Sequence, residues 1–145
     1  MLKNPIFKII SIVSIISGAF LGVISIIPAL TFFILILLMF IMAPFIIIYF
    51  KNLNLIKEIK IEQGIIYGAI AGFTGCIGYS VLFFPLAFFL DLIFKIQSFI
   101  WVKVVCQNII FLLGTIFFTA ILCAILNSFS GFLTAYLYQY FKKGN

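Results

Sequence analysis

The chain has no histidine and no arginine, and its 145 residues include only nine lysines and three acidic residues. Histidine is a usual ligand of zinc and haem, and it is also the usual general base of enzymes, so its absence removes both roles. The three acids are too few and too scattered to supply the paired carboxylates, or the nucleophile with its base, that an enzyme needs. Without arginine, the side chain that recognises phosphates and base edges is missing as well. We therefore expect no catalytic residues, no cofactor, no metal site and no nucleic-acid partner.

Cysteine is also sparse. Cys76, Cys106 and Cys123 stand singly in apolar stretches, and no two of them have the CxxC spacing of a dithiol or metal site. A single cysteine inside an apolar helix usually behaves as a small hydrophobic side chain. We therefore expect a structural role for all three.

Apolar residues make up most of the chain. Hydrophobic residues account for 66% of it and charged residues for 8%, against about a quarter charged in a typical soluble domain. The mean hydropathy is +1.41. A water-soluble globule of this composition would have too few polar side chains to cover its surface. The composition predicts an all-α integral membrane protein in the lipid bilayer, in which residues 1–145 form a single transmembrane domain, a bundle of four transmembrane helices.

Two prolines set the expected helix boundaries in the first apolar run. Residues 9–50 would form a helix of about 63 Å, roughly twice the hydrocarbon core of a bilayer, so the run must turn. Pro28 is the only helix breaker near its middle, and it suits the first turn of a new helix. Pro44 predicts a kink, which is tolerable where neighbouring groups bond the freed carbonyl. The expected helices are 6–27, 29–50, 64–90 and 104–138, with connectors at 51–63 and 91–103.

The two ends of the chain leave alternatives open. Lys3 and Lys8, an apolar run and the small residues 17–19 imitate a signal peptide, but the run continues beyond them, which favours an uncleaved first span. The stretch 104–141 would be about 57 Å long as a helix, which is too long for an upright span. One tilted or kinked helix is the interpretation we favour. The alternative is a break near 127–131, after which the chain follows the membrane surface.

The lysines predict an orientation. With four spans, the N-terminus, the connector 51–63 and the C-terminus share one side and carry seven lysines, whereas the other side has only Lys95 and Lys103. Because cytoplasmic loops are enriched in basic residues, we expect both termini in the cytoplasm and the chain in the cell membrane. An aromatic belt with a basic anchor is expected at the cytoplasmic interface, formed by Tyr136, Tyr138 and Tyr140 followed by Lys142 and Lys143.

Small residues gather along one face of the first and the third expected helices, at 100° per residue. In the third helix, glycines follow one another in GxxxG steps, a spacing that lets helix backbones approach closely in lipid. We interpret this face as packing between helices of one chain. A seam between copies of the chain and a pore or substrate lining are the alternatives. The expected helix-packing face consists of Ser14, Gly18, Gly22, Gly64, Gly68, Gly72 and Gly75.

The fourth expected helix carries a polar but uncharged stripe. Such groups need hydrogen-bond partners in hydrocarbon, so the stripe should face protein or a hydrated cavity. Hydrogen bonding between helices is the interpretation we favour, and a lining for a small-solute path is the alternative. The second expected helix has Thr31 as its only small polar side chain and is expected to face lipid. The polar stripe consists of Asn108, Thr115, Thr119, Cys123 and Asn127.

These features predict a non-enzymatic membrane subunit or accessory protein that packs against a second copy of itself or another membrane protein. The alternative is a small-solute channel or transporter, which the polar stripe favours. The similar segments GAFLG at 18–22 and GAIAG at 68–72 also favour it, since they suggest two related helix pairs. Ion coupling normally needs a carboxylate or a broken helix inside the membrane, and Asp91, at the end of an expected span, is the only acid nearby.

Overall fold

The computed structural model describes residues 5–56, 59–95 and 99–143, with side chains described as far as residue 141. Within these ranges the chain forms six helices and no strand, so the fold is all-α. The helices are α1 (Pro5–Ile24), α2 (Pro28–Phe40), α3 (Met42–Asn52), α4 (Ile61–Phe94), α5 (Ile100–Cys106) and α6 (Ile109–Lys143).

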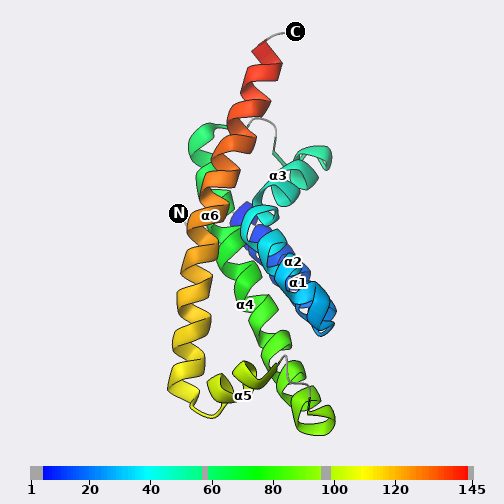
Figure 1. Ribbon diagram of the computed structural model, residues 1–145. Coiled ribbons are helices and arrows are strands. Elements are labelled where there is room, and N and C mark those ends of the chain that lie inside the picture. The colour runs from blue at the N-terminus through cyan, green and yellow to red at the C-terminus, as the bar shows by residue number, and fades with distance from the viewer. Residues whose placement is uncertain (1–4, 57–58, 96–98, 144–145) are drawn as a thin grey trace.

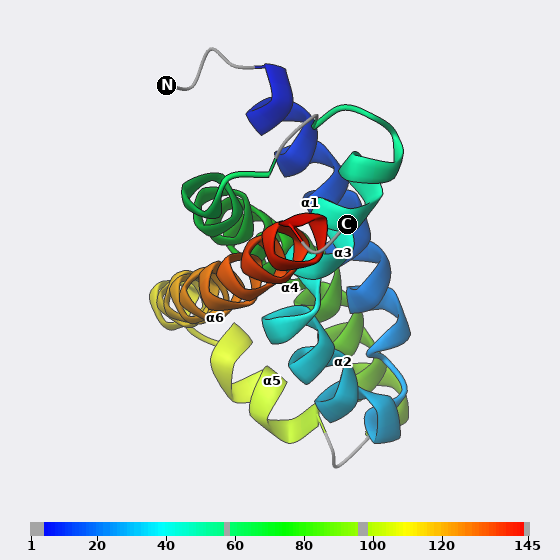
Figure 2. The same cartoon turned by 90° about the horizontal axis from the view of Figure 1, so that it is seen from above.

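Two long helices, α4 and α6, form the main axis of the molecule. They have 34 and 35 residues, which corresponds to about 51 and 53 Å. Figure 1 shows them side by side, with the short helix α5 joining them at one end. Helix α4 contacts α1 as well as α6, and α3 packs against both long helices. Viewed from above, the pair α1 and α2 lies on one side of the molecule and α6 on the other (Figure 2).

The turn between α1 and α2 lies just before Pro28, although α1 ends at Ile24 and not at the expected residue 27. Pro28 begins α2, and Ile27 before it has an extended backbone with φ −77° and ψ 110°. Proline has no amide hydrogen. An amide in the first turn of a helix has no partner within that helix, so proline costs no helical hydrogen bond at this position. The Thr31 hydroxyl donates a hydrogen bond to the Ser25 carbonyl at 2.7 Å, which closes the turn.

A sharp bend of 58° separates α2 from α3 at Ile41. Its cause is Pro44, which cannot donate an amide hydrogen to the Phe40 carbonyl one turn earlier. The kink that Pro44 predicts is therefore a break in the helix, and it opens on the N-terminal side of the proline because the missing bond would have spanned that turn.

The expectation that 29–50 faces lipid is wrong for its second half. In α2, Phe32 and Phe33 are each 68% exposed. After the bend the chain turns inward, and α3 packs against both long helices. Most of one face of α3 is then buried against α4 and α6, namely Met42, Ala43, Ile46, Ile47 and Phe50.

Three helical segments are long and apolar enough to cross a membrane, namely Pro5–Ile24, Ile61–Phe94 and Ile109–Phe141. The bent pair α2 and α3 passes the same test when its two halves are taken together. By length and composition, the described residues therefore supply three candidate spans, or four if the bent pair is one span.

Helix ends differ from the expected ones at several points. Helix α4 begins at Ile61 and ends at Phe94, so it takes residues from both expected connectors. Helix α6 continues through 127–131 without a break. In this region the Ser128 hydroxyl bonds within the helix, to the Ala124 carbonyl at 2.8 Å, and one turn later the Thr134 hydroxyl bonds to the Ser130 carbonyl at 2.8 Å.

Candidate functional site

The five residues of the polar stripe on α6 lie in different surroundings. Asn127 and Cys123 are buried, with 0% and 1% exposure. Thr119 and Thr115 are half-buried, and Asn108 is exposed in front of the first turn of α6. The Asn108 Oδ1 accepts a hydrogen bond from the Ile110 amide at 3.0 Å, which caps the helix. Only the second half of the stripe thus faces the interior of the molecule.

Asn127 lies against the break between α2 and α3. Its Oδ1 accepts a hydrogen bond from the Ala43 amide at 2.9 Å. Its Nδ2 donates to the carbonyls of Leu38 and Met39, both at 2.9 Å. The same Nδ2 lies 2.9 Å from the Cys123 carbonyl in its own helix. The side chain therefore connects α6 to both sides of the bend.

These three backbone groups are among those that the bend sets free, as is the Phe40 carbonyl opposite Pro44. In an unbroken helix the Ala43 amide would bond to the Met39 carbonyl, and the Leu38 carbonyl would accept from residue 42. The carboxamide of Asn127 has both a donor and an acceptor, so it takes the place of the missing helical bonds. Unpaired backbone groups are costly in hydrocarbon, and Asn127 removes that cost at this point.

A small polar layer continues from Asn127 between α4 and α6. The thiol of Cys76 in α4 lies close to Cys123 and Thr119 in α6 and to Ser80 in its own helix. Both Cys76 and Cys123 are buried free thiols. Among the described residues no group of three His, Cys, Asp or Glu side chains is placed to hold a metal ion. The layer therefore consists of thiols and hydroxyls beside the carboxamide.

Most serine and threonine hydroxyls of the two long helices bond within their own helix. Thr115 donates to the Phe111 carbonyl at 2.8 Å, and Thr119 donates to the Thr115 carbonyl at 2.7 Å. Ser14 in α1 donates to the Ile10 carbonyl at 2.7 Å in the same way. In bonds of this kind the hydroxyl hydrogen is donated to the helix backbone, so it is not available to a solute.

One pair of hydroxyls lies outside this pattern. The Tyr79 hydroxyl in α4 lies close to Ser25, in the turn after α1. The geometry between them does not make a hydrogen bond, and both hydroxyl oxygens are buried without a partner in the described part of the chain. The sequence gives no signal for this pair, because nothing in it indicates that the turn after α1 lies beside the middle of α4.

Glycines bring the helices close enough for these contacts. On α4, Gly64, Gly68 and Gly72 lie against α6, where a Cβ at Gly68 would overlap the Asn127 carbonyl oxygen and one at Gly72 the Cys123 carbonyl oxygen. Close approach of the two backbones is thus what places Asn127 and Cys123 at the interface.

The remaining predicted small residues lie at another interface. In α1, Gly18 lies against the backbone of Gly75, and Gly22 against the Tyr79 carbonyl. Ser14 is fully buried near the same crossing. Gly75 also faces the Met42 side chain. The small residues of α4 thus divide between two neighbours, because α1 and α6 cross it at different heights.

Sequence reasoning found Asn127, but it did not find its partners. Leu38, Met39 and Ala43 contribute only backbone groups, which any residue carries. The one signal that pointed to them was Pro44, whose predicted kink requires a hydrogen-bonding neighbour. Comparison with protein families, with curated proteins and with solved structures finds no match to this chain.

Proposed function

We propose that this chain is a cell-membrane protein with four spans, of which the bent pair α2 and α3 is one. The N-terminus, the connector 51–63 and the C-terminus lie in the cytoplasm. Seven of the nine lysines support this orientation, since only Lys95 and Lys103 belong to the other side. The three helices that are long and apolar enough to cross a membrane, together with the bent pair, support the number of spans.

Within the membrane the chain acts as a non-enzymatic subunit that holds its shape and packs against a second copy or another membrane protein. The bonding of Asn127 is the observation that carries this proposal. The most buried carboxamide of the expected stripe binds three backbone groups of α2 and α3, so its donors and acceptor are used to join helices. A fully buried carboxamide whose donors bond to other helices in this way is poorly placed to replace the hydration of a solute.

Co-purification in a mild detergent tests this function. The tagged chain is extracted from membranes and its mass is measured in the micelle, with the bound proteins identified. A subunit is expected to elute with a second copy or with one other membrane protein in a fixed ratio. A chain that elutes as a monomer and conducts a small solute after reconstitution into vesicles contradicts the proposal.

A small-solute channel or transporter is the second candidate, and the break between α2 and α3 favours it. Transporters often use broken helices, whose freed carbonyls coordinate ions. Here, however, Asn127 occupies the carbonyls of Leu38 and Met39. Asp91 lies in the last turn of α4, outside a hydrocarbon layer of about 30 Å centred on that helix of about 51 Å. Neither group supplies a free ion ligand near the middle of the membrane.

A further inference from the structure

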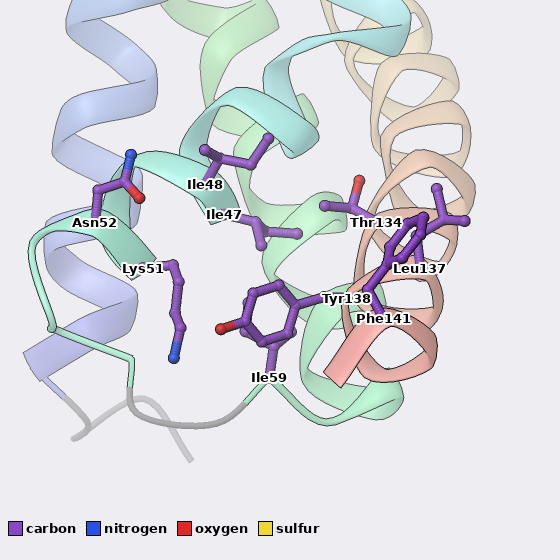
Figure 3. Close-up of a pocket in the computed structure, with 9 residues that line it drawn as sticks. All are labelled: Ile47, Ile48, Lys51, Asn52, Ile59, Thr134, Leu137, Tyr138 and Phe141. Carbon is purple, nitrogen blue, oxygen red and sulfur yellow. The ribbon is translucent and has the colours of Figure 1, made fainter. Parts of the chain in front are cut away.

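A pocket of about 370 Å³ lies between the end of α3, the residues before α4 and the last turns of α6 (Figure 3). Its apolar wall consists of Ile47, Ile48, Ile59, Leu137 and Phe141. Gln139 fixes one side of it, because its Nε2 donates to the Ile59 carbonyl at 2.9 Å and so ties the connector to α6. The volume is at the small end of the range for ligand pockets, which suits a single chain of a lipid.

Among the described residues that line this pocket, one is a cation. Lys51 extends from the last turn of α3, and its Nζ lies 5.1 Å from the centre of the Tyr138 ring on α6. Figure 3 shows the Lys51 side chain and the Tyr138 hydroxyl on facing sides of the pocket. The cation–π contact orients the ammonium group, which has three donors and can bind more than one partner.

The two stretches of sequence that supply the lining residues, 47–63 and 134–143, have a net positive charge. They contain five lysines and only two acids, namely Lys51, Lys57, Lys60, Lys142 and Lys143 with Glu58 and Glu62. An anionic ligand is therefore favoured over a zwitterionic or cationic one. Basic pockets between spans on the cytoplasmic side are a typical place for anionic headgroups.

We infer that this pocket binds an anionic phospholipid of the cytoplasmic leaflet, with one acyl chain along the apolar wall and the phosphate at Lys51. The inference rests on the membrane placement proposed above, because tyrosines and lysines at the end of α6 then mark the headgroup level. Tyr138 belongs to this aromatic belt and also lines the pocket. The pocket thus spans the boundary between acyl chains and headgroups, which is where a phospholipid presents both parts.

Lipid retention in detergent tests the inference. The purified chain is incubated with equal amounts of dioleoyl phosphatidylglycerol and dioleoyl phosphatidylcholine, and bound lipids are counted by native mass spectrometry. We expect phosphatidylglycerol to be retained preferentially. Lys51→Gln should lower its retention about fivefold, the effect of one lysine near an anionic surface. Lys103→Gln, which removes an exposed lysine in α5 at the other end of the molecule, should leave retention unchanged.

A second variant separates binding from folding. Ile48 is 53% exposed, so Ile48→Trp is expected to leave the fold intact while its larger side chain fills the pocket. It should lower phosphatidylglycerol retention as Lys51→Gln does, with an unchanged thermal midpoint in lipid-free detergent. Glycerol phosphate, which has the headgroup chemistry without acyl chains, should not compete at equal concentration.

Three results would overturn the inference: equal retention of the two lipids, equal losses in Lys51→Gln and Lys103→Gln, or full retention in Ile48→Trp. Competition by glycerol phosphate would instead indicate a site for soluble anions, which contradicts a lipid site. Retention is measured in detergent and does not depend on orientation. A failure here is therefore distinguishable from a failure of the proposed topology, which labelling in cells measures separately.

Discussion

Asn127 shows how a single polar side chain in an apolar helix supports a distant segment. Its backbone partners lie more than 80 residues earlier in the sequence, at a bend caused by Pro44. The sequence marks both residues as unusual, one as a carboxamide in hydrocarbon and the other as a proline in a helix. It does not reveal that they act together, because the contact depends on how α6 crosses α3.

Replacing Asn127 with leucine tests this residue. Asn127→Leu keeps the number and branching of the side-chain heavy atoms but leaves the Ala43 amide and the carbonyls of Leu38 and Met39 without their partner. We expect the free energy of unfolding to fall by about 2–4 kcal/mol, since each unpaired buried group is costly even when the structure relaxes. Equilibrium unfolding in mixed detergent and dodecyl sulfate micelles measures it.

Asn108→Ala is the matched control on the same helix. Asn108 is exposed and caps the first turn of α6, so its loss should cost about 1 kcal/mol or less. A loss in Asn127→Leu no larger than in Asn108→Ala would show that the bend does not need the carboxamide.

At the scale of the helices, the sequence predicted which segments are helical better than it predicted which helices pack against one another. The helical wheel placed the α4 glycines on one face, and the structure divides them between α1 and α6. A wheel describes one straight helix and has no information on the height at which another helix crosses it. The bend lies at Ile41 and not at Pro44 itself, because the hydrogen bond that proline cannot make would have spanned the preceding turn.

The close contact between α4 and α6 predicts a low tolerance for side chains at Gly68. A Cβ there would overlap the Asn127 carbonyl oxygen, and backbone atoms cannot move aside as a flexible side chain can. Gly68→Ala should therefore lower the free energy of unfolding by about 1–3 kcal/mol, the usual cost of overpacking. The thermal midpoint in detergent is expected to fall accordingly.

Gly114→Ala provides the control for this contact. Nothing lies within 4 Å of a Cβ added at Gly114 on α6. Alanine favours a helix over glycine by about 1 kcal/mol, so this variant should be neutral or slightly stabilising. A similar loss of stability in Gly68→Ala and Gly114→Ala would show that the close crossing of α4 and α6 does not set the tolerance at Gly68.

At the scale of the whole molecule, composition was sufficient to predict an all-α protein with several long apolar helices. The number of spans and their orientation depend on charge, which has to be tested in a membrane. In a variant whose native cysteines are replaced by alanine, Leu55→Cys should resist an impermeant maleimide in intact cells, and Gln107→Cys should react. Both positions are exposed, so accessibility in the fold does not distinguish them. Labelling of Leu55→Cys from outside would reverse the proposed orientation.

We propose that the polar groups inside the helices bond within or between helices and do not line a solute path. Cys123 tests it most directly, because it is 1% exposed and lies in the polar layer between α4 and α6. The measurement is its rate of reaction with a small water-soluble methanethiosulfonate in the folded protein, after Cys76 and Cys106 are replaced by alanine. We predict no modification until the protein is unfolded. Modification of the folded protein as fast as at an exposed Gln107→Cys would contradict the account and favour a hydrated path.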